Sequence, residues 1–154
     1  MTATGHAVIG TVIAATIPNP WIAAPLAILS HLAADVFPHW DVGTHEKTKS
    51  RKLIMQQAFI DVLFGFIISY LLIIFVFPNT NLLYAFIMII LAQGFDWAWA
   101  PYYFFHIKKF PVFKWIFDFS IHFDNRLGKP WGIINQIAVL VLLVIIAKIY
   151  LSSL

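Results

Sequence analysis

Histidine and aspartate side chains are concentrated in residues 27–41, whose sequence is AILSHLAADVFPHWD. His31 and Asp35 are four residues apart, so a helix would place both side chains on one face. The proline that follows disfavours further helix, which predicts that His39 and Asp41 lie on a tight exit from that helix. Imidazole and carboxylate groups gathered in this way are suited to binding a divalent cation.

The composition around these residues is that of an integral membrane protein. Of the 154 residues, 61% are hydrophobic and only 11% are charged, which is too apolar for a soluble domain of this size. We therefore expect one integral membrane domain over residues 1–154. The chain has no cysteine, which excludes disulfides and thiolate ligands. Its net charge of +3 is too small to indicate a nucleic-acid partner, so we expect none.

The apolar segments predict an all-α, polytopic membrane bundle of about five membrane helices. Residues 4–17 and 21–37 are each short for a full span and are expected to form an N-terminal helical hairpin. Longer apolar segments occupy residues 53–77, 82–105 and 131–151. Residues 106–130 alternate lysines, among them Lys108 and Lys109, with aromatic residues, which is typical of an amphipathic helix at the membrane interface.

The distribution of basic residues predicts the orientation in the membrane. Of the ten Lys and Arg residues, nine lie in the two long polar loops, and the tenth is Lys148. The positive-inside rule places these loops in the cytoplasm. With five crossings, the N-terminus is then cytoplasmic, in the cytoplasmic (inner) membrane of a bacterium or archaeon. The helical rise puts Asp61 and Asp96 about 12 and 14 Å from the cytoplasmic ends of their helices, at the level that His31 and Asp35 approach.

Small residues continue the faces that carry these polar groups. They recur at helical spacing, which lets helices approach closely in lipid. The three stripes are His6, Gly10 and Ala14; Ala23, Ala27, His31 and Asp35; and Gln57, Asp61, Gly65 and Ser69. We expect these helices to pack tightly below a polar chamber that opens toward the cytoplasmic leaflet.

The candidate ligands outnumber what one ion requires. They are His6, His31, Asp35, His39, Asp41, Asp61, Asp96 and His122. A mixed imidazole and carboxylate set is typical of two-metal hydrolytic sites, so we expect a centre of two ions, with Zn or Mn as the metal. Among the carboxylates, those expected to take part in the reaction are Asp35, Asp61 and Asp124. Arg126 and Lys129 follow closely and suit a phosphate group, although attraction to anionic lipid head groups explains them equally well.

Three segments together resemble a known family. They are the Gly5-His6 pair, the sequence SHLAAD at residues 30–35 and the sequence PHWD at residues 38–41. This pattern resembles small bacterial proteins described as predicted membrane-bound metal-dependent hydrolases, including the LexA-regulated inner-membrane hydrolases. The His-x-x-x-Asp pair is more distantly similar to ligand pairs of the zinc-dependent phospholipase C group. The resemblance covers about the first third of the chain and implies a reaction class but no substrate.

We therefore expect a membrane-embedded metal-dependent hydrolase, in particular a phosphoesterase acting on a lipid or lipid-linked substrate at the cytoplasmic leaflet. Membrane lipid is the expected partner. One alternative is a transporter of protons or divalent metal, although the outer half of the bundle offers only Asn, Thr and Ser as polar groups. Another is a non-catalytic membrane scaffold, in which the polar cluster stabilises helix packing.

Overall fold

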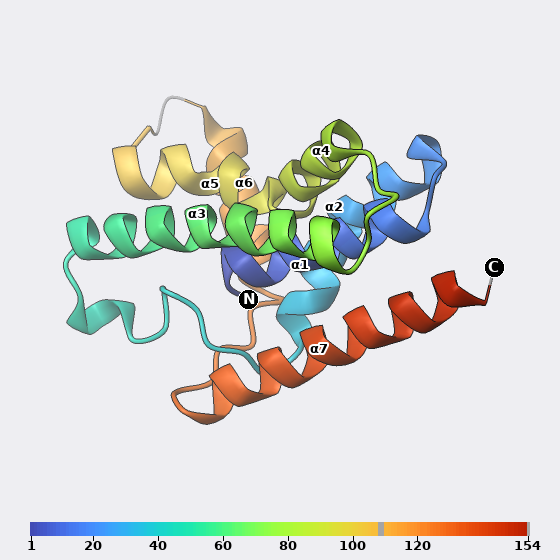
Figure 1. Cartoon of the computed structure of the whole chain (residues 1–154). Coiled ribbons are helices and arrows are strands. Elements are labelled where there is room, and N and C mark those ends of the chain that lie inside the picture. Colours follow the sequence, from blue (N-terminus) through green and yellow to red (C-terminus); the bar gives the residue numbers. More distant parts are fainter. Residues whose placement is uncertain (108–109, 154) are drawn as a thin grey trace.

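The computed structural model describes residues 1–107 and 110–153, and this part of the chain is helical without a β-strand (Figure 1). Lys108 and Lys109 lie outside the described residues. The helices are α1 (Ala3–Thr16), α2 (Pro20–Val36), α3 (Arg51–Phe75), α4 (Leu82–Ala92), α5 (Gly94–Phe105), α6 (Pro111–Ser120) and α7 (Trp131–Ser152), with a 3-10 turn at Glu46–Thr48. The prediction of an all-α protein is confirmed.

The first four α-helices begin at residues whose side chains accept a hydrogen bond from a backbone N–H of the first turn. These residues are Thr2, Asn19, Ser50 and Asn81. Such caps satisfy backbone groups that have no partner inside the helix. The sequence thus fixes locally where each of these helices starts.

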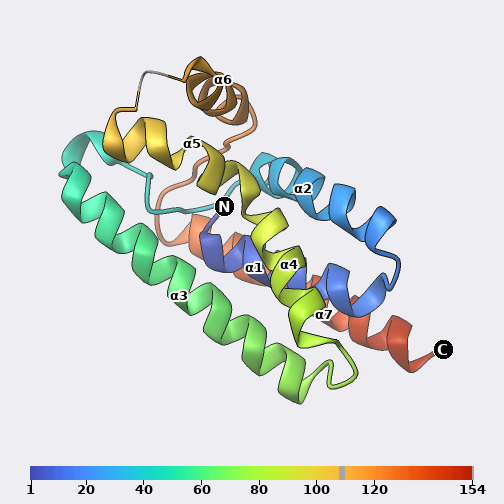
Figure 2. The ribbon, with the colours of Figure 1, turned by 90° about the horizontal axis from the view of Figure 1, so that it is seen from above.

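Helix α1 lies at the centre of the bundle, in contact with α2, α3, α4 and α7 (Figure 2). Its small residues permit this close packing. A Cβ atom on Gly10 would lie 2.8 Å from the backbone oxygen of Met88 in α4. A Cβ atom on Gly65 of α3 would lie 3.1 Å from the Cβ atom of Ala7. Two of the three predicted stripes, those that contain Gly10 and Gly65, therefore form close helix contacts.

Two helices, α3 and α7, are long and apolar enough to cross a membrane. The pair α4 and α5 becomes a third if it is one broken span, with a bend of 50°. Helices α1 and α2 are shorter apolar helices. These features indicate a membrane protein with two to three helices that could span the bilayer.

The apolar segment 82–105, the third candidate span, is broken at Gln93. Pro101 lies within α5. The buried amide of Gln93 donates to the backbone oxygen of Ala3 at 3.1 Å and accepts from Trp97 Nε1 at 3.0 Å. The contact with Ala3 of α1 stabilises the break, and a local helix-breaker rule cannot reveal it.

The prediction of one amphipathic helix over residues 106–130 was wrong. Helix α6 covers only Pro111–Ser120, and the chain after it is a turn and an irregular segment. This segment pairs with the exit of α2: His39 N donates to Asn125 O at 3.1 Å, and Asn125 N donates to Asp35 O at 2.9 Å. Its backbone groups are therefore satisfied by a distant segment instead of by a helix. The pairing carries Asp124 and Arg126 to the end of α2.

Candidate metal centre

Asp35, in the last turn of α2, is the buried carboxylate around which three histidines gather. Its Oδ1 lies 3.3 Å from His6 Nε2 and 3.9 Å from His39 Nε2, and its Oδ2 lies 3.3 Å from His31 Nε2. The N-terminal ammonium of Met1 also contacts Asp35. The sequence spacing of His31 and Asp35 correctly predicted a shared helix face, and α1 and the exit of α2 supply the other two rings.

The first group that could hold a metal ion combines His6, His31 and Asp96, whose ligand atoms all lie within 4.8 Å of one another. His31 Nε2 lies 3.6 Å from Asp96 Oδ1. The His6 and His31 side chains are almost completely buried, with exposed fractions of 0% and 1%. Each residue comes from a different helix, so only the folded bundle forms this group.

The second group combines His39, Asp41 and Asp124, again with ligand atoms within 4.8 Å of one another. His39 Nε2 lies 3.3 Å from Asp124 Oδ1. Because Asp35 Oδ1 approaches both His6 of the first group and His39 of the second, this carboxylate lies between the two groups. The arrangement is suited to two ions that share Asp35.

Hydrogen bonds to backbone carbonyls indicate the tautomers of two rings. His31 Nδ1 lies 2.8 Å from Ala92 O, and His39 Nδ1 lies 2.8 Å from Phe37 O. A carbonyl oxygen can only accept, so Nδ1 carries hydrogen in both rings, and in the neutral form Nε2 presents a lone pair. Both Nε2 atoms face carboxylate oxygens, which also only accept.

Several of these atoms are buried without a hydrogen-bond partner. They include both ring nitrogens of His6, His39 Nε2 and Asp124 Oδ1. The carboxylate oxygens near them, although within 4 Å, are not in hydrogen-bonding geometry. Buried polar atoms without partners are costly, and a bound cation would satisfy them. The donor set therefore fits a divalent metal.

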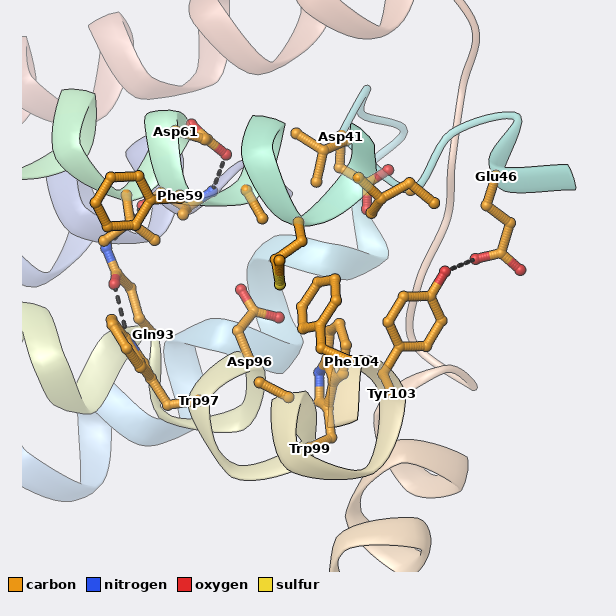
Figure 3. Close-up of a pocket in the computed structure, with 18 of the residues that line it drawn as sticks. Asp41, Glu46, Phe59, Asp61, Gln93, Asp96, Trp97, Trp99, Tyr103 and Phe104 are labelled. Carbon is orange, nitrogen blue, oxygen red and sulfur yellow. Dashed lines mark hydrogen bonds between the residues drawn. The ribbon is translucent and has the colours of Figure 1, made fainter. Parts of the chain in front are cut away.

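Two cavities adjoin the cluster. One, of about 40 Å³, is lined by His31, Asp35 and Asp124 among others and has room for an ion or a water molecule. The other, of about 560 Å³, is mainly apolar and lies between α3 and α5 (Figure 3). We call it the apolar chamber. Asp41 and Asp96 line both cavities, so the chamber adjoins the cluster at these two residues.

Asp61 and His122, predicted as metal ligands, lie outside both groups. Asp61 accepts hydrogen bonds from Ala3 N at 2.7 Å, Thr4 N at 3.2 Å and Thr4 Oγ1 at 2.7 Å. Its carboxylate therefore caps the first turn of α1, where free N–H groups favour negative charge, and it is not placed for the catalytic role that we predicted. His122 is exposed, with Nδ1 2.5 Å from the backbone oxygen of Asp118, because it lies in the turn after α6.

The two predicted phosphate-binding residues already have partners. Arg126 Nη2 lies 2.7 Å from Asp124 Oδ2, its Nε lies 3.2 Å from Asp41 Oδ2, and its Nη1 lies 3.7 Å from Glu46 Oε2. Burial alone would raise the pKa of Asp124, but the neighbouring His39 ring and the charge of Arg126 hold this pKa below its ordinary value. Lys129 Nζ lies 4.2 Å from the centre of a Trp40 ring, in a cation–π contact.

The fold and the cluster together define an all-helical protein with two to three helices that could span a membrane and a buried group of histidines and aspartates. No family model, curated protein or solved structure matches this chain. The resemblance to metal-dependent hydrolases therefore stays an expectation, and function has to be argued from the geometry of the site.

Proposed function

We propose that the protein is a membrane-embedded metal-dependent hydrolase, a phosphoesterase that acts on a lipid or lipid-linked substrate. The observation that carries this proposal is the set of histidine Nε2 atoms turned toward carboxylate oxygens inside the bundle. Two acceptors at 3.3 Å repel each other unless a proton or a cation lies between them. Because two such groups of histidine and aspartate lie on either side of Asp35, we favour a cation over a proton between these atoms.

The charge balance of the cluster supports the same proposal. Four aspartates and one glutamate lie together, against two fixed positive charges, the guanidinium of Arg126 and the ammonium of Met1. The carboxylates are Asp35, Asp41, Asp96, Asp124 and Glu46. An uncompensated excess of negative charge in an apolar bundle is costly, and one or two divalent cations such as Zn or Mn would offset it.

At such a centre the histidines, Asp35 and Arg126 would have different roles. A bound divalent cation would supply a water molecule of lowered pKa and would attract phosphate oxygens. His31 and His39 are held by backbone carbonyls, so their Nε2 atoms are already oriented for binding. Asp35 would be shared between the groups. Arg126 would hold Asp41 and Asp124 in place, a positioning role in addition to any contact with phosphate.

We further propose a multi-pass arrangement in which α1 and α2 enter the membrane as a hairpin beside three spans. This gives the five membrane helices expected from the sequence, with the N-terminus and the cluster near the cytoplasmic leaflet of a bacterial or archaeal inner membrane. The support is the location of nearly all basic residues in the two loops that flank the cluster.

A non-catalytic scaffold is the second candidate, and the contacts of Asp61 favour it. Asp61 ties α3 to the start of α1 by hydrogen bonds alone, so polar groups in this bundle do serve helix packing. A scaffold would hold no more than a structural ion and would turn over no phosphoester. A transporter would also need polar groups beyond the cluster, toward the opposite end of the bundle.

The test combines metal analysis with turnover. The protein, purified in detergent and reconstituted in phosphatidylcholine vesicles, is analysed for bound metal and assayed for phosphate release from lipid phosphomonoesters with Zn or Mn. We expect stoichiometric metal and turnover, both lost in His31→Ala. The matched control is Asp118→Asn, which removes an exposed carboxylate paired with Lys114 on α6. Absence of metal together with unchanged behaviour of His31→Ala would overturn the proposal.

A further inference from the structure

The apolar chamber has the size and lining of a site for a hydrocarbon. Its volume of about 560 Å³ lies within the roughly 300–1,000 Å³ range of small-molecule sites. One wall is a single face of α3, formed by Ile54, Ala58 and Val62, and the facing wall includes Trp97, Ala100 and Phe104 of α5. In Figure 3, Phe59 of α3 lies on the side opposite Trp97 and Phe104.

The chamber opens toward the surface that lipid would cover. Phe59 and Phe105 both line it, yet 64% and 66% of their surfaces are exposed. Phe59 lies on α3, which is one of the two helices that are long and apolar enough to cross a membrane. A chamber whose mouth lies on such a helix is accessible from the acyl-chain region of the bilayer.

Two carboxylates of the candidate metal centre line the chamber. Asp96 belongs to the first metal-binding group and Asp41 to the second, and both line the chamber. Nearby, Tyr103 Oη donates to Glu46 Oε2 at 3.1 Å, which ties α5 to the loop after α2 (Figure 3). A molecule inside the chamber would therefore have a mainly apolar environment and would meet Asp41 and Asp96 where the chamber adjoins the metal centre, while Asp61 and Glu46 line other parts of it.

We infer that the chamber holds one hydrocarbon chain of the substrate lipid, with its polar head group at Asp41 and Asp96. This inference rests on the proposed function and narrows the substrate class to amphiphiles that enter sideways from the membrane. Asp41 is paired with Arg126 at 3.2 Å, but the cluster as a whole carries more negative than positive charge, so the binding of an anionic head group requires the divalent cation. Water-soluble phosphoesters would be poor substrates, because they lack the hydrocarbon chain that fills the chamber.

Photocrosslinking tests this inference. The probe is hexadecyl phosphate with a diazirine at the far end of its chain, added with Mn to the full-length protein in phosphatidylcholine vesicles. We expect labels in residues 54–62 and 97–105. Filling the chamber by Ala58→Phe or Ala100→Phe should reduce labelling by about tenfold or more, since one methylene in an apolar pocket already changes binding by about that factor. Inorganic phosphate should not compete.

The control is Ala138→Phe, which places the same ring on an exposed position of α7 outside the chamber. It should label like the unmodified protein. Thermal unfolding and metal content identify variants that fail to fold, and labelling of the unmodified protein does not depend on any variant. Labels on α7, or equal labelling in Ala58→Phe, Ala100→Phe and Ala138→Phe, would overturn the inference. Competition by inorganic phosphate would show that the head group alone binds.

The result also separates this inference from the proposed function. Bound metal with phosphate release that is equal for short water-soluble esters and for hexadecyl phosphate would leave the hydrolase standing and remove the chain site. Labels in the chamber of a protein without bound metal or turnover would instead support the chain site and overturn the hydrolase. The chamber would then be a lipid site of a non-catalytic protein.

Discussion

The imidazole rings of His6 and His31 are stacked, with centroids 3.8 Å apart and planes 9° apart. They come from α1 and α2, and each turns its Nε2 to a different oxygen of the same Asp35 carboxylate. The Nε2 lone pairs of nearly parallel rings lie in nearly parallel planes, so one ring must tilt if both are to bind a single ion. Asp35 is the carboxylate that both rings contact.

Neutral replacements of the aspartates should separate the two metal groups. We expect Asp96→Asn to weaken the first ion and Asp124→Asn to weaken the second, because each residue belongs to one group only. Asp35→Asn should weaken both, since Asp35 lies between the groups. Mutation of a group that only supports a metal ligand already lowers metal affinity by about tenfold or more. Loss of a ligand itself should therefore lower metal affinity by at least about tenfold. Metal titration by calorimetry gives the number and affinity of the ions.

Asp118→Asn provides the control for charge alone, because Asp118 is an exposed carboxylate paired with Lys114. It should leave both binding steps unchanged. If Asp35→Asn, Asp96→Asn and Asp124→Asn all abolish one and the same binding step, the protein has a single site. A titration that shows no high-affinity step in the unmodified protein would contradict the metal centre itself.

The contact between α1 and α4 predicts a large effect of one added methyl group. Gly10→Ala would place Cβ 2.8 Å from Met88 O and 2.9 Å from Ile89 Cα, both backbone atoms that cannot move alone. We expect a loss of about 1–3 kcal/mol in the free energy of unfolding, as for other overpacked sites. Gly94→Ala is the matched control, since a Cβ there meets nothing within 4 Å. Thermal unfolding in detergent measures both, and equal stability would show that the helices are further apart.

Part of the site could be predicted from the spacing of residues in the sequence. His31 and Asp35 share a helix face because of the period of the helix, and the stripe with Gly10 was visible for the same reason. His39 and Asp124 meet only through backbone pairing of two distant segments, for which no local pattern exists. Depth in the membrane suggested Asp61 as a ligand, but depth does not specify the direction in which a side chain points around its helix.

The cap that Asp61 provides predicts a loss of stability without loss of metal. Asp61→Asn keeps one acceptor oxygen but turns an amide NH2 toward the N–H of either Ala3 or Thr4, since these two groups donate to different oxygens of Asp61. We expect the free energy of unfolding to fall by about 1–3 kcal/mol, the usual result when hydrogen bonds to a charged acceptor are lost. Metal content per folded molecule should stay constant. Loss of metal at unchanged stability would instead restore Asp61 to the ligand set.

Removal of the Arg126 charge tests whether this residue compensates the negative charge of the carboxylates at the second metal group. Arg126→Gln leaves Asp41, Asp124 and Glu46 with one positive charge fewer among them. The guanidinium is partly exposed, so we expect a cost of roughly 1–3 kcal/mol, below the 3–5 kcal/mol of fully buried pairs. The added negative charge should strengthen cation binding, so Zn or Mn should raise the unfolding temperature more in Arg126→Gln than in the unmodified protein. Lys114→Gln, at an exposed ion pair, should change neither quantity measurably. A higher KM for a lipid phosphate with unchanged stability would show that Arg126 binds substrate instead.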